Sequence, residues 1–185
     1  VDPNPRHAGQ GLVRLREAGI TVDSGVLEAE SNRLNEAFNH WIVHRIPWVT
    51  AKSAMTLDGK IATASGQSKW ITGPKSRAHA QRLRLGVDAV LVGVETVLAD
   101  DPSLTVRTQP GFRRPAWHPV KLRIILDTRA RTPLESRLVS DDGRASTLIV
   151  VSELADPARI AALQARVTVI RAPERDGRID LAWLM

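Results

Sequence analysis

The sequence contains no cysteine, and this absence excludes two kinds of site. Without thiols, neither a disulfide nor a thiolate-bound metal can form within the 185 residues. The remaining metal candidates are His40 and His44, whose i, i+4 spacing on a helix would suit a metal ion. No His-Glu-x-x-His pattern accompanies them, so we interpret them as a surface pair and expect no metal site in this chain.

Long apolar runs are absent as well. No stretch reaches the roughly 18 uncharged apolar residues that a membrane span requires. The N-terminus, Val-Asp-Pro-Asn-Pro-Arg, has no signal-peptide hydrophobic region. A hydrophobic content of 43% is nevertheless enough for a packed core. We therefore expect a soluble, cytoplasmic protein without a membrane partner.

Several binding motifs are also missing. The sequence has neither Gly-x-Gly-x-x-Gly nor Gly-x-x-x-x-Gly-Lys-Ser, and it has no recognisable nucleic-acid-binding motif. A net charge of +6 favours anionic partners, either nucleic acid or a phosphorylated small molecule. Because the basic residues are scattered along the chain, we expect the small molecule and no nucleic acid. A basic nucleic-acid-binding module is the alternative from another functional class.

The hydrophobic pattern predicts an α/β fold with a mostly parallel sheet flanked by helices. Apolar runs at 88–94 and 122–126 are typical of strands buried on both faces. The other predicted strands are 20–22, 47–54, 147–151 and 167–170. The predicted helices are 11–18, 26–45, 74–86 and 156–166. An exposed loop is expected at 108–119.

Both ends of the sequence look cut. The N-terminus begins inside a turn-like Asp-Pro-Asn-Pro, and Asp180 is placed to cap an amphipathic helix that does not finish by Met185. We expect a fragment whose C-terminal part is missing.

Three predicted loops follow predicted strands and are candidate walls of one site: 55–73, 94–101 and 127–133. Ligands of open α/β sheets bind at the carboxyl ends of strands, where such segments gather. The first segment is rich in glycine, alanine and serine, which let a ligand approach the backbone, although a surface loop has the same composition. Trp70 could cover an aromatic cofactor there or simply pack in the core.

Charged residues near these segments leave alternatives open. Asp100 and Asp101 are adjacent carboxylates, which fit either a solvated turn or a site. Arg82, Arg84 and Arg107 could bind a phosphate through guanidinium donors, although arginines on a helix are commonly surface residues.

Four colinear segments resemble the reductase domain of the RibD family of bifunctional riboflavin biosynthesis proteins. They are residues 52–60, 64–74, 88–93 and 96–107, and they include Ser-Lys-Trp-Ile-Thr-Gly-Pro and Asp-Asp-Pro-Ser-Leu-Thr-Val-Arg. Residues 2–11, 18–20 and 25–30 resemble the end of the deaminase domain of that family. The resemblance implies a C-terminal remnant of the deaminase domain at 1–25, a connecting helix at 26–46 and an NADPH-dependent reductase domain at 47–185.

The resemblance further implies a dihydrofolate-reductase-like fold and a specific reaction. NADPH would reduce 5-amino-6-(5-phosphoribosylamino)uracil to its ribitylamino product by hydride transfer to the ribosyl C1′, within a bifunctional homodimeric enzyme. Positions that match NADPH-contacting ones are Ala54, Trp70, Thr96, Asp100 and Thr128. Positions that match substrate-contacting ones are Ser68, Arg84, Leu104 and Arg107. We predict catalytic roles for Lys52 and Asp100 as polar groups that act on the sugar.

The sequence departs from the family pattern in three places. The zinc signature of the deaminase, His-x-Glu with Pro-Cys-x-x-Cys, is absent, so zinc is expected only in a deaminase core upstream of Val1. A Gly-rich turn that completes the reductase site is expected beyond Met185. Lys69 stands where glutamine is usual. A paralogue that reduces another pteridine or pyrimidine, such as dihydrofolate, is the alternative enzyme.

Overall fold

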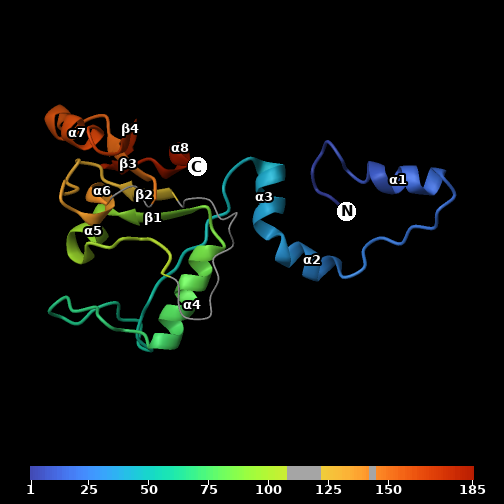
Figure 1. Cartoon of the computed structure of the whole chain (residues 1–185), viewed down its shortest axis with the longest axis horizontal. Helices are drawn as coiled ribbons and strands as arrows, with labels where there is room; N and C mark the ends of the chain where they lie inside the picture. Colours follow the sequence, from blue (N-terminus) through green and yellow to red (C-terminus); the bar gives the residue numbers. More distant parts are fainter. Residues whose placement is uncertain (108–121, 142–144) are drawn as a thin grey trace. The chain divides into compact units, whose positions relative to one another are not determined.

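The computed structural model describes residues 1–107, 122–141 and 145–185, so the predicted loop at 108–119 lies outside the described residues. The chain divides into two compact units, residues 1–53 with Met185 and residues 54–184 (Figure 1). In the described ranges, none of the helices combines the length and apolar character that crossing a membrane would require.

The first unit contains three helices, α1 (Gln10–Glu17), α2 (Glu28–Leu34) and α3 (Glu36–His44). The helix predicted at 11–18 is confirmed, and Gly19 ends it with a φ of 77°. The single helix predicted at 26–45 is wrong, because α2 and α3 are separated at Asn35, whose φ is −107°. The amide of Asn35 donates to the carbonyl of Ser31 at 2.9 Å, and such side-chain bonds compete with helix continuation.

The strands predicted at 20–22 and 47–54 are also wrong, because neither segment is a strand in the structure. A strand exists only when its backbone groups pair with a neighbouring strand. Neither segment pairs with any strand in the part of the chain that the structure describes. Alternation of apolar and polar residues therefore predicted strand geometry without predicting a partner.

The second unit is built on a four-stranded parallel sheet in the order β1-β2-β3-β4. Its strands are β1 (Ala89–Gly93), β2 (Leu122–Leu126), β3 (Thr147–Ser152) and β4 (Thr168–Ala172). They confirm four of the predicted strands and the parallel α/β class. A short antiparallel hairpin follows, formed by β5 (Glu174–Arg175) and β6 (Arg178–Ile179).

The described residues of this unit also form five helices: α4 (Pro74–Leu85), α5 (Val94–Asp100), α6 (Arg137–Ser140), α7 (Pro157–Gln164) and α8 (Leu181–Leu184). The sequence predicted where three of these helices begin. Pro74 is the first residue of α4, and Asp156 and Asp180 accept hydrogen bonds from the N–H groups of Ala158 and Ala182 at 2.9 and 2.8 Å. The loop predicted at 94–101 is instead α5 and its C-cap residue.

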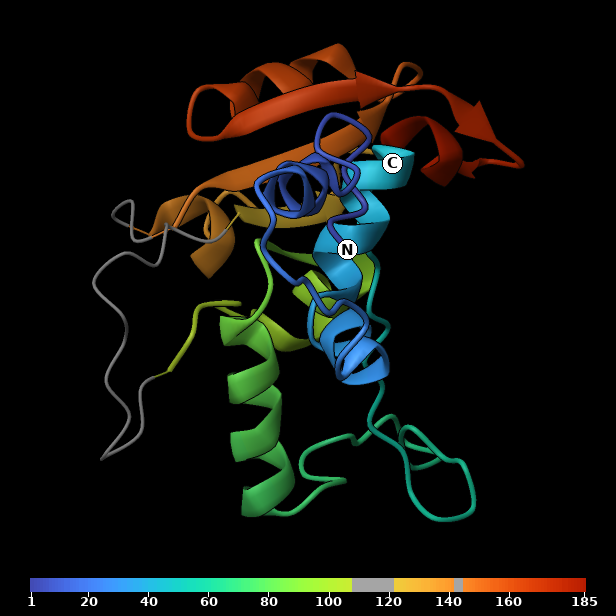
Figure 2. The same cartoon turned by 90° about the vertical axis from the view of Figure 1, so that its right-hand side faces the viewer.

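The core lies mainly on one face of the sheet. Ile125, Ile149 and Val151 point to that face and pack with apolar residues of α5, α6 and α7. Successive parallel strands joined by right-handed crossovers place their connecting helices on the same face, which accounts for this arrangement. Figures 1 and 2 show that α4, by contrast, runs across the direction of the strands.

The opposite face carries a smaller cluster around Val150, Ala172 and Ile179. The prediction that β1 is buried on both faces is wrong, since Leu91 is 41% exposed. β1 is an edge strand of the four-stranded sheet, and within the described residues no strand lies beyond it.

Replacing Ile149 by Ala should lower the free energy of unfolding by about 2–5 kcal/mol, because the side chain is fully buried and a cavity would remain. Urea denaturation measures the change. Leu154→Ala is the control, since Leu154 is 75% exposed and its loss should cost less than about 0.5 kcal/mol. Equal losses for the two variants would contradict the assignment of the core.

Candidate active site

Thr96 and Thr128 lie at the carboxyl edge of the sheet. Thr96 is in the first turn of α5, directly after β1, and Thr128 is two residues beyond β2. Because Gly93 and Leu126 are paired in register, the two threonines follow neighbouring strand ends. Thr96 is exposed and Thr128 is half-buried, so both hydroxyls can reach a ligand.

The residues beside these threonines join α5 to the segment after β2. Arg131 donates to the carboxylate of Glu95 and forms an ion pair with it. The hydrogen bond to Glu95 raises the pKa of Arg131. This contact crosses the carboxyl edge between the positions that hold Thr96 and Thr128.

Asp127 shapes the same segment and was missed by sequence reasoning. Its Oδ2 accepts hydrogen bonds from the backbone N–H of Thr132 at 2.6 Å and from the Thr132 hydroxyl at 2.7 Å. The carboxylate is fully buried, so it fixes the turn that carries Thr128 and does not contact solvent. The available signal was an acidic residue placed directly after a buried strand.

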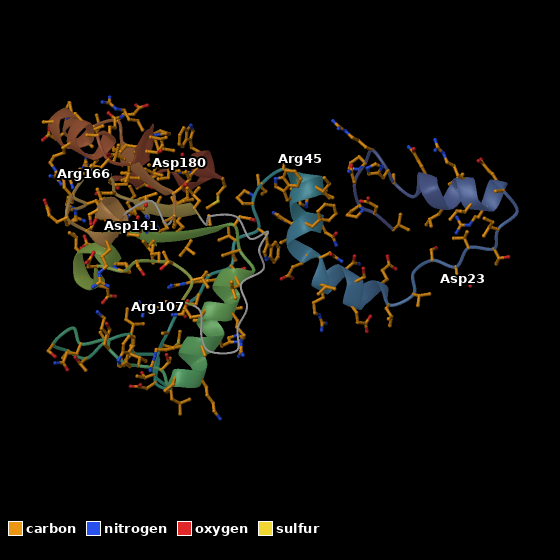
Figure 3. The ribbon with its side chains drawn as sticks, in the orientation of Figure 1. Asp23, Arg45, Arg107, Asp141, Arg166 and Asp180 are labelled. Carbon is orange, nitrogen blue, oxygen red and sulfur yellow. The ribbon has the colours of Figure 1, made fainter. Side chains whose placement is uncertain are left out.

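Arg84 and Arg107 lie together near the C-terminal end of α4. Arg107 is labelled in Figure 3. Arg84 donates to the carbonyl of Thr105 at 3.4 Å, and the N–H of Arg107 donates to Gln81 at 3.0 Å. Burial lowers the pKa of Arg84, and the nearby charge of Arg107 lowers that pKa further. The third candidate, Arg82, is exposed, and its side chain makes no hydrogen bond or ion pair within the described residues.

No carboxylate of the described residues lies within 4.0 Å of either Arg84 or Arg107. Two cations held close together without a counter-ion repel each other, and partial burial weakens the screening by water. An anion bound between them would relieve this repulsion, which makes the pair a phosphate-binding candidate.

Leu104 lies in the segment that leads to Arg107, but it faces the core. It is 4% exposed and belongs to the main apolar cluster. Its φ of 51° is unusual for a residue other than glycine. The packing of Leu104 therefore determines the path of the segment, and its predicted substrate contact stays a prediction.

Lys69 brings the segment 55–73 to the end of α5. Its Nζ lies 2.9 Å from Oδ1 of Asp100. Ser68 and Trp70 flank Lys69, so these three predicted site positions, 68, 70 and 100, come to one region. Trp70 is 68% exposed and lies under the guanidinium of Arg77 at 4.5 Å, which excludes core packing as the explanation for this residue.

Asp101 has a structural contact that distinguishes it from Asp100. Its Oδ1 accepts a hydrogen bond from the N–H of Arg137 at 2.8 Å, and its Oδ2 lies 3.4 Å from Nε of the same residue. Both acids are exposed at the end of α5, as in a solvated turn, and each carboxylate also has a partner from a distant segment.

The structure thus arranges the predicted residues in three groups within the second unit: Thr96 with Thr128, Ser68 and Trp70 with Asp100, and Arg84 with Arg107. Ala54 is the first residue of that unit, whereas Lys52 belongs to the first unit. The joint catalytic role of Lys52 and Asp100 stays a prediction.

A cleft of about 640 Å³ opens at the opposite end of the strands, where β3 and β4 begin. Its lining includes Arg123, Asp141, Thr147, Arg166 and Thr168. None of the predicted site residues is among its lining residues, so the candidate site and the cleft are separate.

The family model of the RibD C-terminal domain matches residues 47–185. The chain belongs to the RibD C-terminal domain family. This match covers the second unit and each of the predicted site residues, and it confirms the family resemblance seen in the sequence.

Similar proteins extend the family assignment. The riboflavin biosynthesis protein RibD of Actinobacillus pleuropneumoniae is 43% identical over 186 aligned positions, which cover 100% of this chain and 47% of that protein. The protein of the same name from Aquifex aeolicus is 46% identical over 83% of this chain and 41% of its own length. The chain therefore spans about half the length of these RibD relatives.

Solved structures of RibD proteins are similar in fold to this chain. Acinetobacter baumannii RibD has a TM-score of 0.74 at 34% identity, over 94% of this chain and 46% of that one. A Thermotoga maritima structure has a TM-score of 0.70 at 34% identity, over 92% and 51% of the two chains. That Thermotoga protein is described as a diaminohydroxyphosphoribosylaminopyrimidine deaminase and 5-amino-6-(5-phosphoribosylamino)uracil reductase. The predicted dihydrofolate-reductase-like fold of the RibD reductase domain is confirmed.

Replacing Asp101 by Ala should destabilise this RibD-family chain by about 1 kcal/mol, because the first N–H of α6 loses its acceptor. Asp101→Asn should retain most of the stability, since its amide oxygen can accept the same bond. Chemical denaturation of both variants measures the difference. If Asn costs as much as Ala, the hydrogen bond is not what stabilises α6.

Proposed function

We propose that the chain is the reductase part of a riboflavin biosynthesis enzyme. In this proposal it reduces 5-amino-6-(5-phosphoribosylamino)uracil to 5-amino-6-(5-phosphoribitylamino)uracil with NADPH. The observation that carries the proposal is the uncompensated pair Arg84 and Arg107, found in a chain of the RibD family. A phosphorylated substrate supplies the anion that these two guanidiniums lack.

The chemistry of the donor groups fits NADPH, a dinucleotide with an anionic backbone and aromatic rings. Thr96 and Thr128 present hydroxyl donors at the carboxyl edge of the sheet. Trp70 presents an exposed indole suited to covering a ring. When bound, NADPH supplies a hydride to the ribosyl C1′. The residues proposed to hold it are Ala54, Trp70, Thr96, Asp100 and Thr128.

The substrate side is proposed to consist of Ser68, Arg84, Leu104 and Arg107. Arg84 and Arg107 bind the phosphate and orient the ribose chain, since a guanidinium can give two parallel hydrogen bonds to one phosphate. Asp100, which is exposed beside Lys69, is placed between the cofactor and substrate groups in this proposal and acts with Lys52 on the sugar. Holding the reacting atoms in fixed geometry is the main contribution of the protein.

The wider protein is proposed to be bifunctional, cytoplasmic and homodimeric. Residues 1–25 are proposed to be the remnant of a zinc-dependent deaminase domain, and 26–46, which form α2 and α3, to connect it to the reductase domain at 47–185. The relatives, which are about twice as long as this chain, support this proposal.

Arg84→Ala and Arg107→Ala should each raise the KM of the phosphoribosyl substrate by about 10- to 100-fold, the loss expected for a charged hydrogen bond. The KM of NADPH should change by less than about twofold, because that cofactor binds elsewhere in the proposal. Steady-state kinetics of the intact protein measure both constants. Arg82→Ala is the matched control on the same helix, and it should behave like the wild type.

Other outcomes would favour the other functions. If the arginine variants keep a normal KM and the protein reduces dihydrofolate equally well, the chain is a paralogue with another substrate. If NADPH is not consumed and the protein binds nucleic acid with an affinity that falls steeply with salt, it is a nucleic-acid-binding module.

A further inference from the structure

Arg123 is a buried charge outside the candidate site. It lies in β2, among apolar neighbours, and is 1% exposed. A hydrophobic residue would fit a buried strand without the cost of removing a guanidinium from water. The presence of arginine therefore requires an explanation from the groups that it contacts.

Most of the contacts of Arg123 hold α6 and the start of β3. Its Nε and Nη2 donate to the Thr147 hydroxyl at 3.0 and 2.6 Å, and its guanidinium forms a bidentate pair with Asp141. Nη2 also donates to the carbonyls of Leu138 at 3.4 Å and Ala145 at 3.0 Å. These bonds satisfy the buried ends of the α6 to β3 connection.

One further bond reaches the segment that carries the substrate residues. Nη1 of Arg123 donates to the carbonyl of Ser103 at 3.2 Å. Ser103 directly precedes Leu104, and Arg107 follows four residues later. Residues 101–107 form neither helix nor strand, so contacts of this kind determine their path. The segment has three further contacts of this kind. Asp101 accepts from the N–H of Arg137, the carbonyl of Thr105 accepts from Arg84, and the N–H of Arg107 donates to Gln81.

We propose that Arg123 is a positioning residue for substrate binding. By holding the carbonyl of Ser103, it fixes residues 101–107 so that Arg107 lies beside Arg84. Five N–H donors in one plane allow a single side chain to bind α6, β3 and this segment at once, which lysine cannot do. The inference rests on the proposed function, since it assigns the substrate phosphate to Arg84 and Arg107.

The test compares Arg123→Lys with Arg166→Ala in the intact protein. Arg166 lines the same cleft and donates to the carbonyl of Leu134, and within the described residues it has no hydrogen bond or ion pair to 101–107. Arg123→Lys should raise the KM of the phosphoribosyl substrate about tenfold, while kcat and the KM of NADPH change by less than about threefold. Arg166→Ala should leave both KM values unchanged. A merely structural role for Arg123 would lower the melting temperature and leave the substrate KM unchanged, which would overturn the inference.

Hydrogen exchange gives a second measurement that does not depend on activity. In Arg123→Lys, the backbone N–H groups of Asp101 and of 103–107 should exchange several-fold faster than in Arg166→Ala, because a fixed segment would become mobile. If Arg123→Lys does not fold, Arg123→Gln takes its place, since its one short amide cannot bind Ser103, Asp141 and Thr147 at once. Unchanged exchange in 101–107 overturns the inference.

The two proposals fail in different ways. A wild-type protein that shows no NADPH-dependent reduction of the phosphoribosyl substrate rejects the proposed function, and the inference with it. An active wild type together with a normal substrate KM in Arg123→Lys rejects the inference alone.

Discussion

The second unit depends on the requirement that the buried guanidinium of Arg123 be fully paired. A buried charge costs several kcal/mol unless charges and hydrogen-bond acceptors surround it. Its acceptors come from Ser103, Leu138, Asp141, Ala145 and Thr147. Their positions in the chain are 15 to 24 residues from Arg123. All of them are in place only when the sheet, α6 and residues 101–107 are assembled together.

The same requirement connects the core with the candidate site. Residues 101–107 pack Leu104 into the core and carry Arg107 to the surface beside Arg84. The repulsion between the two arginines is tolerated because neighbouring groups hold each of them, Thr105 for Arg84 and Gln81 for the backbone of Arg107. In the proposed function, an anion that binds this pair would need little rearrangement of the protein.

The sequence predicted those parts of the fold that depend on local patterns. Apolar runs identified β1 to β4, and Pro74, Asp156 and Asp180 identified helix starts, since these signals act within a few residues. The break at Asn35 and the absence of strands at 20–22 and 47–54 were not predictable in this way. A strand depends on a partner that its own residues do not specify.

In the candidate site too, individual residues were predicted from the sequence, but contacts with distant segments were not. The family resemblance indicated Thr96, Thr128, Arg84 and Arg107, but their grouping arises from contacts between distant segments. The pair of Lys69 with Asp100 and the contact of Asp101 with Arg137 are of this kind. Asp127 and Arg123 were overlooked because each lies in or directly after an apolar strand, where the pattern indicates only burial.

The most direct test of the account follows the hydride. The intact protein is incubated with 5-amino-6-(5-phosphoribosylamino)uracil and NADPH that carries deuterium at both C4 positions of the nicotinamide, and the product is analysed by mass spectrometry and NMR. A reductase of the proposed kind forms a ribitylamino product with a single deuterium at C1′. A product without deuterium, or with deuterium on the pyrimidine ring, would contradict it.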